Sequence, residues 1–167
     1  MEAISVFDIF KIGVGPSSSH TMGPWRAAQR FIAAVRERGV FDRVQRVQVD
    51  LYGSLAKTGL GHGTDIAVML GLAGEDPETC DPALIDAHVE AIKDAGRLRL
   101  DGKRGVEFVY DGDLRFHMQE SLPFHPNGLT FRAILDDGSR VEEAYYSVGG
   151  GFVVQEGEQA TGARAVK

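Results

Sequence analysis

The chain has 167 residues, 43% of them hydrophobic and 25% charged, and its formal net charge is −6. This composition is typical of one globular domain, and the negative charge argues against nucleic acid as a partner. All apolar runs fall short of the roughly 18 residues that a membrane span needs, and no secretory signal opens the chain, so we expect a cytoplasmic protein without membrane contact.

The first third of the chain predicts two helical segments and one strand. Three apolar side chains at helical spacing indicate a short amphipathic segment over residues 4–12. Residues 24–38 place their apolar side chains on one helical face, and Gly39 follows as a stop signal, so this stretch is predicted as a helix. Valines in near alternation over residues 44–51 predict a strand that finishes at Gly53.

The middle of the chain is expected to be mostly helical. Residues 53–65 are glycine-rich and are predicted as a loop. A helix follows to Leu72, with Thr64 or Asp65 as its N-cap. A second helix is predicted over residues 81–93, because it opens with an Asp-Pro pair, which suits the first turn of a helix.

After Gly96 the hydrophobic pattern changes to a period of two, which predicts strands. These strands cover residues 98–100, 106–110, 114–117, 129–135, 141–148 and 152–154. Asp136-Asp137-Gly138 is a strong hairpin signal between two of them. The order predicts an α+β fold with helices on one sheet face and the other face open to a partner. We expect a domain over residues 1–155 and the start of a linker over 156–167, which is polar and small.

A Gly/Pro/Ser-rich loop over residues 13–24 is the first candidate site. It brings hydroxyls, an imidazole and free backbone N–H groups to the start of a predicted helix, a place that binds carboxylates and phosphates. The candidate residues are Ser17, Ser18, Ser19, His20 and Thr21. The alternative is that Ser19 or Thr21 only caps the helix.

The second candidate is His62, which lies between Gly61 and Gly63. Neighbours without side chains let another molecule approach closely and keep an imidazole reachable. An ordinary imidazole has a pKa of about 6.5, which suits a general base. The alternative is that these glycines serve a tight turn alone.

Two further motifs lie at the ends of predicted strands. His125-Pro126-Asn127-Gly128 offers an imidazole and an amide, although Asn-Gly on its own is more typical of a hairpin turn. Three glycines, Gly149 to Gly151, lose much conformational entropy on folding, so they suggest a backbone held close to something else. His88 and His117 lie within predicted regular elements and are assigned no role.

Familiar catalytic patterns are absent from the sequence. It has no Gly-x-Ser-x-Gly elbow, Walker-type phosphate loop, complete Gly-x-Gly-x-x-Gly or His-Glu-x-x-His. Ser19 and His20 are adjacent, a spacing that does not by itself align a hydroxyl with an imidazole, and Lys57 lacks a convincing pyridoxal phosphate motif. The single Cys80 is too little for an iron-sulfur cluster or a four-ligand zinc site, so any such metal must be shared with another segment.

Four motifs, taken together and in this order, resemble the β domain of bacterial iron-sulfur L-serine dehydratases. They are Ser5-Val6-Phe7-Asp8 with Gly15 to Thr21, Leu51 to Asp65, His125 to Gly128, and Tyr146 to Phe152. The resemblance spans nearly the whole chain, and it implies an enzyme that converts L-serine to pyruvate and ammonia.

The resemblance also implies a cofactor and partners. In the family, cysteines of a second, α domain hold a 4Fe-4S cluster, one iron of which acts as a Lewis acid on serine while a base removes the Cα proton. This chain is then inactive alone, and its partners are L-serine, an α domain, fused or separate, and a second copy in a homodimer. His62 is the expected base, and His20 is the second expected catalytic residue. The expected substrate-site residues are Ser17, Ser18, Ser19, His20, Thr21, His125, Asn127, Gly149 and Gly150.

A competing function stays open at this point. The family's β domain is similar to the effector-binding intervening domain of some phosphoglycerate dehydrogenases, which implies a mixed, largely antiparallel sheet and also a regulatory role. On that interpretation the glycine loops bind an effector anion. A plain dimerisation domain is a third possibility, and it leaves the histidine loops without a purpose.

Overall fold

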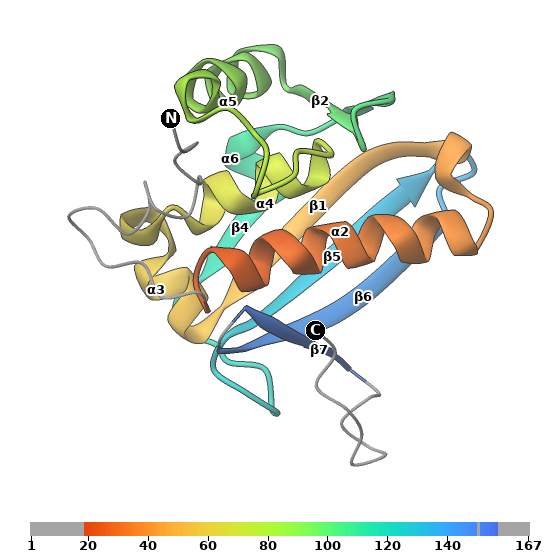
Figure 1. The fold of residues 1–167 in the computed structure, drawn as a ribbon. Coiled ribbons are helices and arrows are strands. Elements are labelled where there is room, and N and C mark those ends of the chain that lie inside the picture. The colour runs from red at the N-terminus through yellow and green to blue at the C-terminus, as the bar shows by residue number, and fades with distance from the viewer. Residues whose placement is uncertain (1–18, 150, 157–167) are drawn as a thin grey trace.

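The computed structural model describes residues 19–149 and 151–156, without the side chains of residues 60–62. In this part of the chain the fold is α+β, with five α-helices and a mixed, mostly antiparallel sheet of seven strands (Figure 1). The segment predicted over residues 4–12 and nearly all of the linker predicted over 156–167 lie outside the described residues.

Helices predominate in the first part of the described chain and strands in the later part. The helices are α2 (Met22–Glu37), α3 (Gly53–His62), α4 (Thr64–Leu72), α5 (Ile85–Ala95) and α6 (Tyr110–Asp113), with 3-10 turns at Phe41–Arg43 and Pro82–Leu84. The strands are β1 (Val44–Tyr52), β2 (Arg97–Leu100), β3 (Arg104–Glu107), β4 (Leu114–His117), β5 (Gly128–Leu135), β6 (Arg140–Gly149) and β7 (Phe152–Gln155). No described helix is long and apolar enough to cross a bilayer.

The sheet is organised around β1. Its order is β2-β3-β1-β5-β6-β7, and β4 also pairs with β1. The pairings of β1 with β3 and with β4 are parallel, and the other pairings are antiparallel. The registers Tyr52↔His117, Leu51↔Leu129 and Gly128↔Tyr146 place the ends of β1, β4 and β6 and the start of β5 at one end of the sheet.

The hydrophobic core lies between the sheet and α2, which crosses β5, β6 and β7 (Figure 1). Phe31 of α2 stacks on Phe131 of β5 with ring centroids 5.2 Å apart. α4 packs against α2 at Gly71, where a Cβ atom would lie 2.8 Å from both the Ala28 Cβ and the Trp25 carbonyl oxygen. The small residues at this crossing let the two helices approach closely.

The opposite face of β1 carries a buried carboxylate. Asp50 is 2% exposed, and it receives Arg115 Nε at 2.8 Å and His117 Nε2 at 2.7 Å. Arg132 of β5 lies 3.6 Å from the same carboxylate. A buried charge of this kind persists because it is paired and hydrogen-bonded.

Two arginines of α2 bind the backbone around β7. Arg26 Nη1 donates to the Gly151 carbonyl at 3.1 Å, and Arg30 Nη1 donates to the Val153 carbonyl at 3.0 Å. Val153 lies opposite Ser147 in the pairing of β6 with β7. The Ser147 N–H points away from β7 and donates to the Asn127 carbonyl, so Ser147 and Val153 form a pair without hydrogen bonds between them. The backbone N–H and C=O of Val153 therefore point away from β6, toward the free side of β7. Arg30 therefore donates to a carbonyl group that points outward from the edge strand of the sheet.

Most elements agree with the sequence-based prediction. The helix predicted over residues 24–38, the strand over 44–51 and the later strands from residue 114 onward are confirmed within about two residues. The hairpin at residues 136–138 is confirmed, with Gly138 at φ +82°. Asp81 caps the 3-10 turn before α5, accepting the Ala83 N–H at 2.9 Å.

The predicted loop over residues 53–65 is wrong, because this stretch forms α3 and the start of α4. Leu55 and Ala56 are buried on one side of α3, so packing outweighs the poor helix propensity of the interior glycines. Gly63, at φ +76°, ends α3 and occupies the N-cap position of α4. Neither Thr64 nor Asp65 caps α4 as expected.

Two smaller predictions also fail. Asn127-Gly128 is not a hairpin turn, because β4 and β5 lie on opposite sides of β1 and do not pair with each other. Gly128 instead packs closely against Leu122, whose Cδ1 would lie 2.9 Å from a Cβ at this position. The strand predicted over residues 106–110 ends at Glu107, and Tyr110 begins α6.

Candidate functional site

His20 lies between two serine hydroxyls. Its Nδ1 is 2.9 Å from Ser19 Oγ, and its Nε2 is 3.1 Å from Ser54 Oγ in the first turn of α3. The Ser19 hydroxyl therefore lies within hydrogen-bond distance of the His20 ring, an alignment that adjacency in the sequence does not by itself provide. The His20 carbonyl also accepts a hydrogen bond from Thr64 Oγ1, which fixes this turn against the start of α4.

The first turn of α3 is joined to the segment that precedes β5. The Gly53 N–H donates to the Glu120 carbonyl at 2.7 Å, and the Ser54 N–H donates to the Pro126 carbonyl at 2.9 Å. Gly53 has a φ of +53°, and a Cβ there would lie 2.5 Å from the Pro126 oxygen. Glycine is required at this position by both the backbone angle and the close approach.

Asn127, the residue after Pro126, connects this segment to β6. Its backbone N–H donates to His125 Nδ1 at 3.0 Å, so a neutral His125 ring carries its proton on Nε2. The Asn127 side-chain amide donates to the Ser147 carbonyl at 3.2 Å, and the Ser147 N–H donates to the Asn127 carbonyl at 3.0 Å. Hydrogen bonds thus join His20 to Ser54, Ser54 to the Pro126 carbonyl, and Asn127, the residue after Pro126, to Ser147.

Ser147 has a buried hydroxyl without a partner in the described part of the chain. Its exposed fraction is 0%, and its Oγ makes no hydrogen bond to the described residues. A buried donor of this kind costs about 1–3 kcal/mol unless a ligand or solvent molecule satisfies it. The oxygen is therefore a group through which this site can bind a polar molecule.

The glycines after β6 are explained in part. Gly149 has a φ of +101°, and nothing lies within 4 Å of a Cβ built there. A Cβ at Gly151 would overlap Met22 at the start of α2. The expected close approach of the backbone is therefore confirmed at Gly151, where the contact is with α2.

The structure brings together six of the residues predicted for the substrate site. Ser19, His20, Thr21, His125, Asn127 and Gly149 lie at the sheet end where β1 and β6 finish and β5 begins. Ser17, Ser18, Gly150 and the side chain of His62 lie outside the described residues. Thr21 holds the N-cap position of α2 without a side-chain capping bond.

Two further residues of this site, Ser54 and Ser147, were not predicted. The sequence did not indicate Ser54 because the glycine-rich stretch around it is typical of a loop. In the structure this stretch is a helix, whose first turn places the Ser54 hydroxyl beside His20. The sequence did not indicate Ser147 as a site residue because the residues around it predicted only the end of a strand. The histidines assigned no role lie elsewhere, with His117 beside Asp50 and His88 3.5 Å from Glu75.

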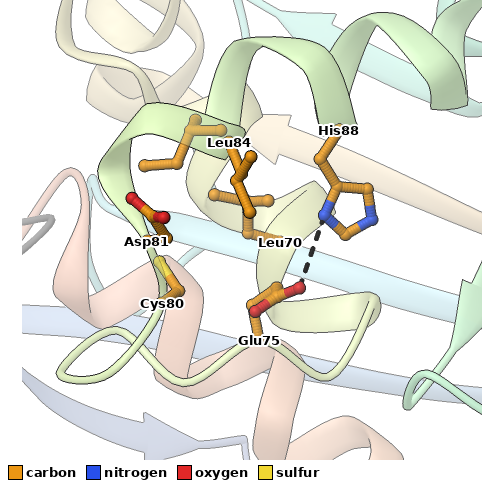
Figure 2. A pocket seen from close by; sticks show the side chains of 7 residues that line it. Leu70, Glu75, Cys80, Asp81, Leu84 and His88 are labelled. Atoms are coloured by element: carbon orange, nitrogen blue, oxygen red, sulfur yellow. Dashed lines mark ion pairs between the residues drawn. The ribbon is translucent and has the colours of Figure 1, made fainter.

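A small pocket contains the only cysteine of the sequence (Figure 2). Cys80 lies there with Glu75, Asp81 and His88, and no group of three or more metal-binding side chains occurs among the described residues. Burial, followed by the charges of Glu75 and its acidic neighbours, raises the pKa of the Cys80 thiol. A protonated lone thiol does not hold a cluster, so the described residues do not fit an iron-sulfur cofactor.

The raised pKa predicts a poorly reactive thiol. Because less thiolate is present at any pH near neutrality, Cys80 should react with iodoacetamide several-fold more slowly at pH 8 than the cysteine of an unstructured, uncharged peptide. The rate should rise as the pH increases toward the elevated pKa. Alkylation followed by mass spectrometry checks this, and a rate equal to that of the peptide cysteine would contradict it.

Comparisons with known proteins agree with the motifs at this site. The family model described as "Serine dehydratase beta chain" matches residues 5–158. The chain is 52% identical over 155 residues to an L-serine dehydratase of Streptomyces coelicolor and 47% identical over 154 residues to L-serine dehydratase 1 of Escherichia coli. Each alignment covers 92% of this chain and 34% of the relative, so the chain spans about a third of the length of these relatives.

Proposed function

The chain belongs to the serine dehydratase beta chain family, and we propose that it forms part of the active site of an L-serine ammonia-lyase. The complete enzyme converts L-serine to pyruvate and ammonia. The observation that carries this proposal is a series of contacts that unites motifs far apart in the sequence. His20 bonds to Ser54, Ser54 bonds to the Pro126 carbonyl, and the adjacent Asn127 bonds to Ser147.

The reaction needs a base for the Cα proton and donors that hold the carboxylate and hydroxyl of serine. Hydroxyls, an imidazole and an amide at one sheet end supply such donors. We assign this binding role to Ser17, Ser18, Ser19, His20, Thr21, His125, Asn127, Gly149 and Gly150. We assign the role of base to His62, the last residue of α3, whose first turn carries Ser54.

The cofactor of this reaction is proposed to be a 4Fe-4S cluster held outside this chain. The described residues do not fit such a group, and the relatives are about three times as long as the matched region. The cluster would supply a Lewis acid for the departing hydroxyl. An α domain, fused or separate, is therefore the proposed partner, within a homodimer.

The segment between β4 and β5 is the surface that we propose meets the α domain. Met118 and Phe124, two of the four large apolar side chains exposed in the described part of the chain, are 44% and 50% exposed and both lie in this segment. Phe124 packs edge-on against Tyr146, and Pro126 binds Ser54, so this surface continues directly into the site. Docking here would enclose His20 and Asn127 between the two domains.

Anaerobic pyruvate release from L-serine tests the proposal. The samples are this chain, a cluster-reconstituted α domain, and the two combined or fused. We expect activity only in the combination, because the site is shared. Full activity of the α domain alone would overturn the catalytic role and favour an effector-binding domain, similar to the intervening domain of phosphoglycerate dehydrogenase.

A further inference from the structure

The His20 ring is held at both nitrogens, and the two contacts differ in origin. Ser19 is its neighbour in the chain, whereas Ser54 comes from α3, 34 residues further along. A neutral imidazole donates from one nitrogen and accepts at the other, so the direction of the Ser54 contact determines the direction of the Ser19 contact.

The position of Ser54 decides this direction. It lies in the first turn of α3, a helix of ten residues, where the aligned peptide dipoles create a partial positive charge, although the Gly53 and Ser54 N–H groups are paired with loop carbonyls. A nitrogen lone pair facing this end is favoured over an N–H group facing it. The residue four positions earlier, Asp50, lies in β1, so no helical carbonyl competes for the Ser54 hydroxyl proton.

We propose that Ser54 is a positioning residue that donates to His20 Nε2 and holds the ring as the Nδ1–H tautomer. The Nδ1–H group then donates to Ser19 Oγ. Ser19 Oγ consequently accepts from the imidazole, and in the complete enzyme this fixed hydroxyl group contacts an oxygen of the bound amino acid. This last step rests on the proposed function, whereas the tautomer does not.

Ser54 also connects the imidazole to the rest of the site. Its N–H binds the Pro126 carbonyl, so one residue fixes both His20 and the segment that carries His125 and Asn127. Alanine at this position keeps the backbone contact and removes only the hydroxyl. Ser54→Ala therefore isolates the effect on the imidazole.

Nitrogen-15 NMR of the histidine rings in this 167-residue chain reads the tautomer directly. We expect His20, assigned by its loss in His20→Gln, to be the Nδ1–H form. Ser54→Ala should shift it toward the Nε2–H form that free imidazoles favour, and Ser54→Thr should restore Nδ1–H. Thr58→Ala is the matched control, because this exposed hydroxyl on the same helix donates to the Ser54 carbonyl.

Kinetics of the complete enzyme give the second measurement. Ser54→Ala should lower kcat by about 10- to 100-fold, because the donors are misplaced, with a smaller change in KM. Ser54→Thr should recover most of this loss, and Thr58→Ala should match the parent.

Two results would overturn the inference. One is an Nε2–H tautomer in the parent chain, which decides the matter even if Ser54→Ala fails to fold. The other is an unchanged tautomer in Ser54→Ala. An α domain that is active alone would instead remove the proposed function and leave the NMR result intact, so the two failures are distinguishable.

Discussion

Replacement of His62 by alanine in the complete enzyme should lower turnover by about 10²- to 10⁴-fold, the range typical of losing a general base. KM should change much less, because a base acts on the Cα proton mainly in the transition state. Initial rates of pyruvate release over a range of L-serine concentrations measure both parameters.

His88→Ala is a matched control for this experiment. His88 lies on α5 beside Glu75, in the pocket around Cys80, and we expect the parent rate from this variant. Deuterium at the Cα of serine adds a second readout, since proton removal should become more rate-limiting when the base is lost. Unchanged turnover in His62→Ala would remove this residue as the base.

Gly53→Ala should destabilise the chain by about 3 kcal/mol and abolish most activity of the complete enzyme. Alanine at φ +53° is strained, and its Cβ would lie 2.5 Å from the Pro126 oxygen and 2.8 Å from Ser121 Oγ. The segment that carries Pro126 must move away from α3. Urea unfolding of this chain and pyruvate release by the complete enzyme measure the two effects.

Gly39→Ala separates backbone strain from the steric clash. Gly39 has a similar angle, φ +71°, but nothing lies within 4 Å of a Cβ built there. This control should therefore lose only about 1 kcal/mol and keep the activity. Equal losses in the two variants would show that the contact with Pro126 does not hold the site together.

The sequence predicted correctly those helices and strands in which buried residues recur at a regular spacing. The apolar stripe of α2 and the alternation in β5 and β6 are both set by contact with one core, so their periodicity is visible in the sequence. α3 was missed because its glycines are poor helix formers. Its stability comes from the burial of Leu55 and from packing on β1 and β4, which no local pattern reveals.

The site was only partly predictable for a related reason. Motif composition pointed to His20 and Asn127, but nothing in the sequence indicated that Ser54 connects them. That connection depends on β1 ending beside the start of β5, which is a property of the sheet topology. Residues that act through non-local contacts are therefore the ones that composition and spacing miss.

The arginines of α2 affect how copies of this domain can associate. An exposed sheet edge is a template for a strand from another molecule, and β7 is the last strand on its side of the described sheet. Arg30 already binds the outward carbonyl of Val153, so an incoming strand must first displace a guanidinium group. Edge-to-edge growth into fibrils through β7 is thereby disfavoured.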